Sequence, residues 1–346
     1  MTTALKTDPA LTKGVRWSPA RMGWPRPQPI LLTLAVVLAV VFPFVVPDAS
    51  WIGIATLGLV WMTLNQSWNL VLGFSGVWNF GQLAIYAFGG YVAALLSLHT
   101  QLPPVVSLLL GGVGATLLSL LLALPALRLR GIYVSLLTFG FAEVVRLLII
   151  SDQSKVTGGA FGLSGFAGFG LEALDSETRQ KVMYWIALAV VIVTSLVIFA
   201  VIRSPLGNGV IALRDNPALA AARGINPRTY QLLVFGISGF FAGIAGGLYA
   251  FVFGVISPSL MGLGPMTLLV TMLVVGGLGT MIGPIVGIII ITLIQARLQE
   301  WPDIRLLVLG LLLLVMVVAA PRGLVPLISR LRKGLARWIA ADGRKN

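Results

Sequence analysis

The sequence predicts an all-α fold, a polytopic bundle of helices that crosses a lipid bilayer about ten times. Hydrophobic residues make up 58% of the 346 residues, and charged residues make up only 10%. Several apolar runs reach the roughly 20 residues that a helix needs to cross the hydrocarbon core. These runs are continuously apolar, whereas the strands of a membrane barrel alternate apolar and polar residues. Because every backbone polar group in lipid needs an internal partner, helices are the expected structure.

The predicted spans are ten apolar segments. They are residues 30–46, 52–72, 83–98, 105–127, 131–150, 182–202, 231–252, 266–280, 282–298 and 304–320. Two of them are short and glycine-rich, and at 1.5 Å per residue a 15-residue helix covers only about 22 Å of a core of about 30 Å. The 266–298 region could therefore hold two short spans or a re-entrant pair buried in protein, and the total could be eight.

The loop charges favour an even number of spans, because basic residues prefer the cytoplasmic side of the membrane. With both termini inside, the 151–181 loop lies outside and carries three basic and four acidic residues. The 203–230 loop then lies inside and carries four basic residues and one acidic residue. Eight or ten spans give this same orientation.

The net charge of +13 comes largely from the two ends of the chain. Five of the 24 basic residues lie in the segment 1–29, and seven lie in the tail 321–346. Basic residues that flank spans favour the cytoplasm and anionic lipid headgroups, so this charge indicates membrane orientation rather than nucleic-acid binding. No small-residue cleavage site follows the first apolar run, which is expected to remain as a span.

A compact helix with well-defined ends is predicted inside the polar stretch 203–230. Asn216 is suited to the N-cap, and Pro217 then falls at the first helical position. The residues 218–222 are strong helix formers. Gly224 is placed to end the helix in a left-handed conformation.

The surroundings of this helix are basic, since Arg214, Arg223 and Arg228 are opposed only by Asp215. An isolated helix of this length is marginal in water, which favours a docking element for a cytoplasmic partner. The alternative is a short interfacial helix that only joins two spans.

The stretch 207–226 fits the pattern G-x-x-x-x-A-L-R-D-N-P-x-x-A-x-x-x-G-I-N. This pattern resembles the cytoplasmic coupling loop of the branched-chain amino-acid ABC importer permeases, M-type subunit. The resemblance implies that the short helix sits in a groove of an ATP-binding subunit. The docking residues implied in this way are Arg214, Asp215, Asn216, Pro217, Ala220, Ala221 and Gly224.

Three further segments are similar to the same family. They are NLVLGFSGVWNFGQLAIYAFGGYVAALL from Asn69, TFGFAEVVRLL and TGGAFGLSGF. The resemblance covers most of residues 52–330. It implies an ABC importer permease-like bundle with residues 30–320 as its transmembrane domain.

Amide side chains cluster around the break at 73–82, which contains three glycines and no charge. Asn65 and Asn69 are one turn apart on one helix face, and Asn79 and Gln82 lie within the break. The break is either a tight cytoplasmic turn or a broken helix whose freed backbone groups line a polar path. The amides are correspondingly either links between helices or part of that path.

Glu143 and Arg146 lie three residues apart in a predicted span, so they share a helix face and can pair. An unpaired charge at mid-membrane costs roughly 2.5–3.5 kcal/mol. The pair is either structural or involved in substrate passage. The candidate residues of a translocation path are therefore Asn65, Asn69, Asn79, Gln82 and Glu143.

Glycines at four-residue spacing predict close helix packing. Gly239, Gly243 and Gly247 form one such stripe, and Gly283 and Gly287 form another. Small residues let helices approach closely in a bilayer, where no hydrophobic force drives their association.

Catalytic motifs are absent from the sequence. There is no cysteine and only one histidine, His99, which excludes a Cys metal site and an H-E-x-x-H motif. The chain has neither G-x-S-x-G nor the P-loop pattern G-x-x-x-x-G-K-[ST]. We therefore predict a chain that is not an enzyme and has no catalytic residue, metal site or cofactor of its own, with ATP and Mg²⁺ bound by partner subunits.

The predicted function is a permease subunit of a bacterial inner-membrane ABC importer for branched-chain or related hydrophobic amino acids. The resemblance implies three kinds of partner besides membrane lipid: a second related permease, two ATP-binding subunits and a periplasmic substrate-binding protein. A permease for urea or another small amide is the alternative within the same architecture. An ion-coupled secondary transporter is the alternative from a different class, although Glu143 is its only plausible intramembrane acid.

Overall fold

The computed structural model describes residues 29–46, 48–100, 102–129, 131–152, 156–166, 169–171, 174–320 and 323–327. The two basic ends predicted to be cytoplasmic, 1–29 and 321–346, lie almost entirely outside these residues. The regular secondary structure of the described residues is helical apart from one short strand pair, which confirms the all-α fold class. The helices are α1 Pro29–Val45, α2 Ala49–Asn69, α3 Gln82–Thr100, α4 Pro104–Ala126, α5 Ile132–Ile150, α6 Ser176–Arg203, α7 Pro205–Asp215, α8 Pro217–Ala222, α9 Pro227–Phe253, α10 Leu263–Gly276, α11 Gly283–Arg297 and α12 Pro302–Ala319.

Each predicted span coincides with one helix, and α7 and α8 are additional. Six helical segments of the described chain are long and apolar enough to cross a membrane, while α10 and α11 have only 14 and 15 residues. The chain is therefore a multi-pass helical membrane protein. The number of complete spans stays a prediction. Helix α1 forms a separate unit, a 17-residue apolar helix with Pro43 inside it.

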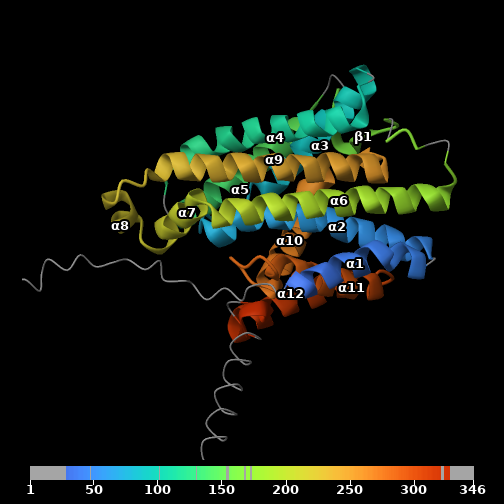
Figure 1. The fold of residues 1–346 in the computed structure, drawn as a ribbon. Helices are drawn as coiled ribbons and strands as arrows, with labels where there is room; N and C mark the ends of the chain where they lie inside the picture. Colours follow the sequence, from blue (N-terminus) through green and yellow to red (C-terminus); the bar gives the residue numbers. More distant parts are fainter. Residues whose placement is uncertain are drawn as a thin grey trace, which may run out of the picture. The chain divides into compact units, whose positions relative to one another are not determined.

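The core of residues 46–346 is built around α9. This helix runs beside α4 and α3, while α2 packs against both α6 and α9 (Figure 1). Helices α10 and α11 form an antiparallel pair, because the chain reverses between them at residues 277–282, and α10 also contacts α12. The short strands Leu163–Ser164 (β1) and Val255–Ile256 (β2) pair antiparallel, which ties the α5–α6 connection to the end of α9.

The predicted glycine packing is confirmed at both stripes. A side chain at Gly243 would overlap Ala115 of α4, and one at Gly239 would overlap Ser119. Added atoms at Gly287 would likewise strike the carbonyl of Met272 in α10. The backbones therefore approach too closely for any side chain larger than hydrogen, as expected for helices that associate in lipid.

Candidate functional site

The helix predicted at 216–224 is present as α8. The Asn216 side chain accepts a hydrogen bond from the Leu219 N–H at 3.0 Å, and Pro217 occupies the first turn. Gly224 has φ +85°, and the Ile225 N–H donates to the Ala220 carbonyl across it. The predicted cap and stop are both confirmed. They are local features, which is why the sequence alone could specify them.

Almost the whole surface of helix α8 is exposed. Ala220 is its only buried residue, whereas Leu219 is 49% exposed. Figure 1 shows α7 and α8 at one end of the bundle, between α6 and α9. A short capped helix with an exposed leucine and a basic surround is suited to docking in a groove. Of the docking residues implied by the resemblance, Ala220 is buried against its own chain, and the Arg214 side chain bonds back to the Gly73 carbonyl.

Helix α7 was not predicted, because within the polar stretch 203–230 a helix was expected only at 216–224. It buries Val210 in the core cluster that contains Phe235, it also buries Leu213, and a side chain at Gly209 would overlap the Tyr230 ring. This packing holds α7 as a helix and gives α8 a fixed base. The polar stretch 203–230 is therefore an ordered pair of helices.

Arg214 joins this pair to the membrane part of the chain. Its guanidinium Nη1 donates to the Gly73 carbonyl at 3.0 Å, and its Nε donates to Asp215 Oδ1 at 3.0 Å. Arg214 therefore points back into the bundle, while α8 points away from it.

The Gly73 carbonyl belongs to a π-helical turn, Leu70–Phe74, that ends α2. An added Cβ at Gly73 would overlap Asn69 Oδ1 and the Gly279 nitrogen. Asn69 Oδ1 accepts from the Gly279 N–H at 2.9 Å, and Asn69 Nδ2 donates to the Thr280 carbonyl at 2.8 Å. We call the set Asn69, Gly73, Arg214, Gly279 and Thr280 the junction. It brings together three segments that are far apart in sequence.

The second group of amides joins α2, α3 and α9. Gln82 Nε2 donates to the hydroxyls of Ser67 and Ser238, each at 3.1 Å. Asn79 Oδ1 accepts from the Gly81 N–H, and its Nδ2 donates to Gln82 Oε1 at 3.3 Å. Both amides are fully buried. Within the described chain, the hydrogen bonds of these two amides link α2, α3 and α9.

Asn65 differs from the other amides. Its Nδ2 contacts Met272 Sδ at 3.6 Å, but its Oδ1 accepts no hydrogen bond from the described residues. The same holds for Gln66 Oε1 one position on. Buried acceptors of this kind normally find a partner, so they are the strongest places in the group for a water or a polar substrate group.

Glu143 and Arg146 form the predicted pair on α5. Arg146 Nε donates to Glu143 Oε2 at 2.9 Å, and Nη2 donates to Oε1. The Glu143 side chain is 40% exposed, and the Arg146 side chain is 30% exposed. The geometry is bidentate, the strongest form of this interaction.

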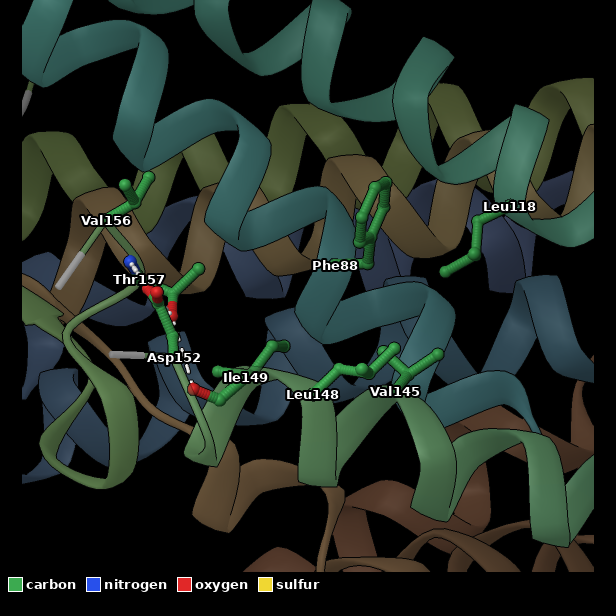
Figure 2. Close-up of a pocket in the computed structure, with 8 residues that line it drawn as sticks. All are labelled: Phe88, Leu118, Val145, Leu148, Ile149, Asp152, Val156 and Thr157. Atoms are coloured by element: carbon green, nitrogen blue, oxygen red, sulfur yellow. Dashed lines mark hydrogen bonds between the residues drawn. The ribbon is translucent and has the colours of Figure 1, made fainter. Parts of the chain in front are cut away.

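A pocket of about 400 Å³ lies between α3, α4 and α5. Figure 2 shows Val145 and Ile149 of α5 facing Phe88 of α3, with Leu118 of α4 farther along. The polar groups at one end of the pocket bond to each other, because Asp152 Oδ2 accepts from both the N–H and the hydroxyl of Thr157. None of the predicted path residues lines it.

Residues 50–317 match the family model described as branched-chain amino acid transport system / permease component. This match covers most of the chain. The chain belongs to this family. The family match confirms the resemblance that the 207–226 segment of this permease carries.

Individual relatives agree with the family match. The permease is 32% identical to the high-affinity branched-chain amino acid transport system permease protein LivM of Escherichia coli K12, over 90% of this chain and 78% of the relative. The LivM protein of Salmonella typhimurium LT2 is 31% identical with the same coverage. A probable LivM permease of Methanocaldococcus jannaschii is 22% identical, over 78% of this chain and 92% of the relative. No solved structure matches the chain.

Proposed function

We propose that this chain is the membrane-spanning permease subunit of an ABC importer that moves branched-chain or related hydrophobic amino acids into the cell. The single observation that carries the proposal is the family match over residues 50–317. The capped, exposed helix α8 supports it, because an importer without its own nucleotide motif needs a surface that receives work from an ATP-binding subunit.

The partners proposed for the permease are a second related permease, two ATP-binding subunits that hold ATP and Mg²⁺, and a periplasmic substrate-binding protein. The proposed location is the bacterial inner membrane, with both termini in the cytoplasm. In this orientation α8 and the α10–α11 turn face the cytoplasm. The reason is that an odd number of predicted spans lies between each of them and the loops on the outer side of the membrane. The proposed docking surface is α8 with its caps, Asn216 and Gly224.

Arg214 is proposed to transmit movement of α7 and α8 to the membrane part. It lies between α8 and the Gly73 carbonyl, and Gly73 contacts Gly279 directly. A shift of α7 would therefore act on the end of α2 and on the α10–α11 turn together. Asn65, Asn69, Asn79, Gln82 and Glu143 remain the proposed path residues, with the amides of α2 closest to this moving region.

The experiment that tests the function is purification of the permease from its native membrane in a gentle detergent, with every co-purifying subunit identified by mass. An ATP-binding subunit and a second permease are expected, together with uptake that requires ATP. A homogeneous chain that transports in ATP-free vesicles under an ion gradient would instead establish the secondary transporter.

Gly224→Val is expected to weaken the association with the ATP-binding subunit. A β-branched residue at φ +85° is strained, and the left-handed conformation alone costs about 1–2 kcal/mol. The strain distorts the end of α8. The amount of ATP-binding subunit that co-purifies with the variant measures the effect.

Gly254→Val is the matched control for this substitution. Gly254 also has positive φ, at +68°, and at both glycines an added Cβ would meet open space. It ends α9 away from α8, so the ATP-binding subunit should be retained. Equal losses in the two variants would show general destabilisation and count against docking through α8.

Asn69→Leu and Gln82→Leu are expected to impair uptake per assembled complex. Each leaves buried polar groups unpaired, at a cost of about 1–3 kcal/mol per group, and each removes an amide from the proposed path. Uptake and melting temperature should be measured on the same preparations. A lower melting temperature with normal uptake per complex would restrict these amides to packing.

A further inference from the structure

Helix α5 has one buried face and one exposed face. Val134, Thr138, Ala142 and Ile149 are its buried residues. On the opposite side, Leu136 is 69% exposed, and the other residues of that side are exposed or half-buried. We call this side the outer face of α5, and it consists of Leu136, Phe139, Gly140, Glu143 and Leu147.

The Glu143–Arg146 pair lies deep in the span. Glu143 is roughly 17 Å along the helix from Ile132 and roughly 10 Å from Ile150, at 1.5 Å per residue. The pair between Lys181 and Glu177 differs, because it lies in the opening turns of α6, ahead of the predicted span that begins at 182. Only the α5 pair places partly exposed charges among apolar residues of a span, as far as the described residues show.

Lipid is a poor environment for this face. Charged side chains within spans face a bundle interior or a water-filled cavity, because acyl chains offer them no hydrogen bonds. The described chain does not provide that cover, since 40% of the Glu143 side chain and 30% of the Arg146 side chain are exposed. The cover must come from outside these residues.

We propose that the outer face of α5 lines a water-filled path shared with the second permease subunit, and that Glu143 and Arg146 bind the ammonium and carboxylate groups of a zwitterionic amino acid there. This inference rests on the proposed function and deepens it. It commits the exposed face to one occupant, a second permease that leaves an aqueous gap over the ion pair.

The chemistry of the pair fits a zwitterion. The guanidinium of Arg146 presents a planar fork of donors that matches a carboxylate, and the Glu143 carboxylate accepts from an ammonium group. Without substrate the two side chains neutralise each other. An entering amino acid exchanges partners with them one for one, so no net charge is left in the membrane. A neutral amide such as urea offers no such exchange.

The neighbours of the pair suit an apolar substrate side chain. Leu136, Phe139 and Leu147 surround Glu143 on the outer face. The pocket in Figure 2 is a different place, because its α5 residue Val145 is turned about 160° from Glu143 at 3.6 residues per turn. The pocket's polar end is already satisfied by the Asp152–Thr157 contact.

The absence of cysteine from the chain makes the aqueous path directly testable. Gly140→Cys adds a thiol where a Cβ meets nothing within 4 Å, and Leu196→Cys on α6 is the control, at a site that is 58% exposed in a span segment without charge. The assembled importer in vesicles is treated with a membrane-impermeant, charged methanethiosulfonate. Gly140→Cys should react roughly tenfold faster or more, since the reactive thiolate forms in water. Leucine with binding protein and ATP should change that rate.

Two outcomes of the labelling would overturn the proposal. Equal, slow reaction of both cysteines with the charged reagent, with fast reaction of both with a lipid-soluble maleimide, would place the outer face in lipid. Failure of Gly140→Cys to react with either reagent would show a dry subunit contact.

Charge variants test the binding role. Glu143→Gln and Arg146→Gln should each lower uptake roughly tenfold or more, with subunit recovery unchanged, because each removes one charged partner of the substrate. The exchanged pair, Glu143→Arg with Arg146→Glu, keeps an ion pair and should keep recovery normal while uptake stays low. Uptake restored by the exchange would show a structural pair. Wild-type ATP-dependent uptake is measured in parallel, so failure of this inference is distinct from failure of the proposed function.

Discussion

Gly246→Ala is expected to lower the folding yield and the melting temperature of the permease sharply. A Cβ at this position in α9 would overlap the Tyr86 carbonyl oxygen of α3 and lie 2.9 Å from the Gly90 nitrogen. These are backbone atoms of a fully packed helix, so they cannot move aside as a side-chain end could. Overpacking of a well-packed core typically costs about 1–3 kcal/mol and occasionally more. The measurement is the monodisperse yield and melting temperature in detergent.

Gly236→Ala is the control on the same helix. An added Cβ there would lie 3.7 Å from Leu120 and 3.8 Å from Thr116, which is ordinary van der Waals contact. Its yield should match the wild type. A normal melting temperature for Gly246→Ala, or equal losses in the two variants, would contradict the close approach of α3 and α9.

Features that the sequence predicts well are those that a short segment determines by itself. Continuous apolar runs predict helices because lipid leaves the backbone no other partner, and each predicted segment coincides with a helix. Asn216 and Gly224 specify the two ends of α8 through contacts within a few residues. The Glu143–Arg146 pair follows from helix periodicity in the same way.

Features that depend on distant residues escaped prediction. The helix α7 carries local signals that were missed, since Pro205 follows Ser204 at its start and Leu206, Val210 and Leu213 recur at helical spacing. Only the packing of Val210 in the core cluster shows that this short segment is an ordered helix. Asn69 is conspicuous as an amide in an apolar span, but its partner Gly279 is 210 positions away. Likewise nothing in the sequence around Arg214 shows that its side chain bonds to the Gly73 carbonyl rather than facing a partner subunit.

Arg214→Ala is expected to uncouple ATP hydrolysis from transport while leaving the ATP-binding subunit attached. The substitution removes the hydrogen bond to the Gly73 carbonyl but leaves the Asn216 cap and Gly224 stop of α8 in place. A hydrogen bond to a charged group contributes about 1.5–3 kcal/mol. Coupling free energy of that size corresponds to roughly a tenfold to hundredfold change in the ratio of uptake to ATP hydrolysis. That ratio is measured in proteoliposomes that contain the whole importer.

Two variants separate transmission from docking. Arg228→Ala removes the same charge from an exposed position in the same loop and should leave the ratio unchanged. Arg214→Lys keeps the charge and one donor, so it should recover part of the ratio. Loss of the ATP-binding subunit from Arg214→Ala would assign Arg214 to the docking surface instead. A normal ratio would mean that the junction plays no part in coupling, because Arg214 is the residue through which α7 bonds to the end of α2.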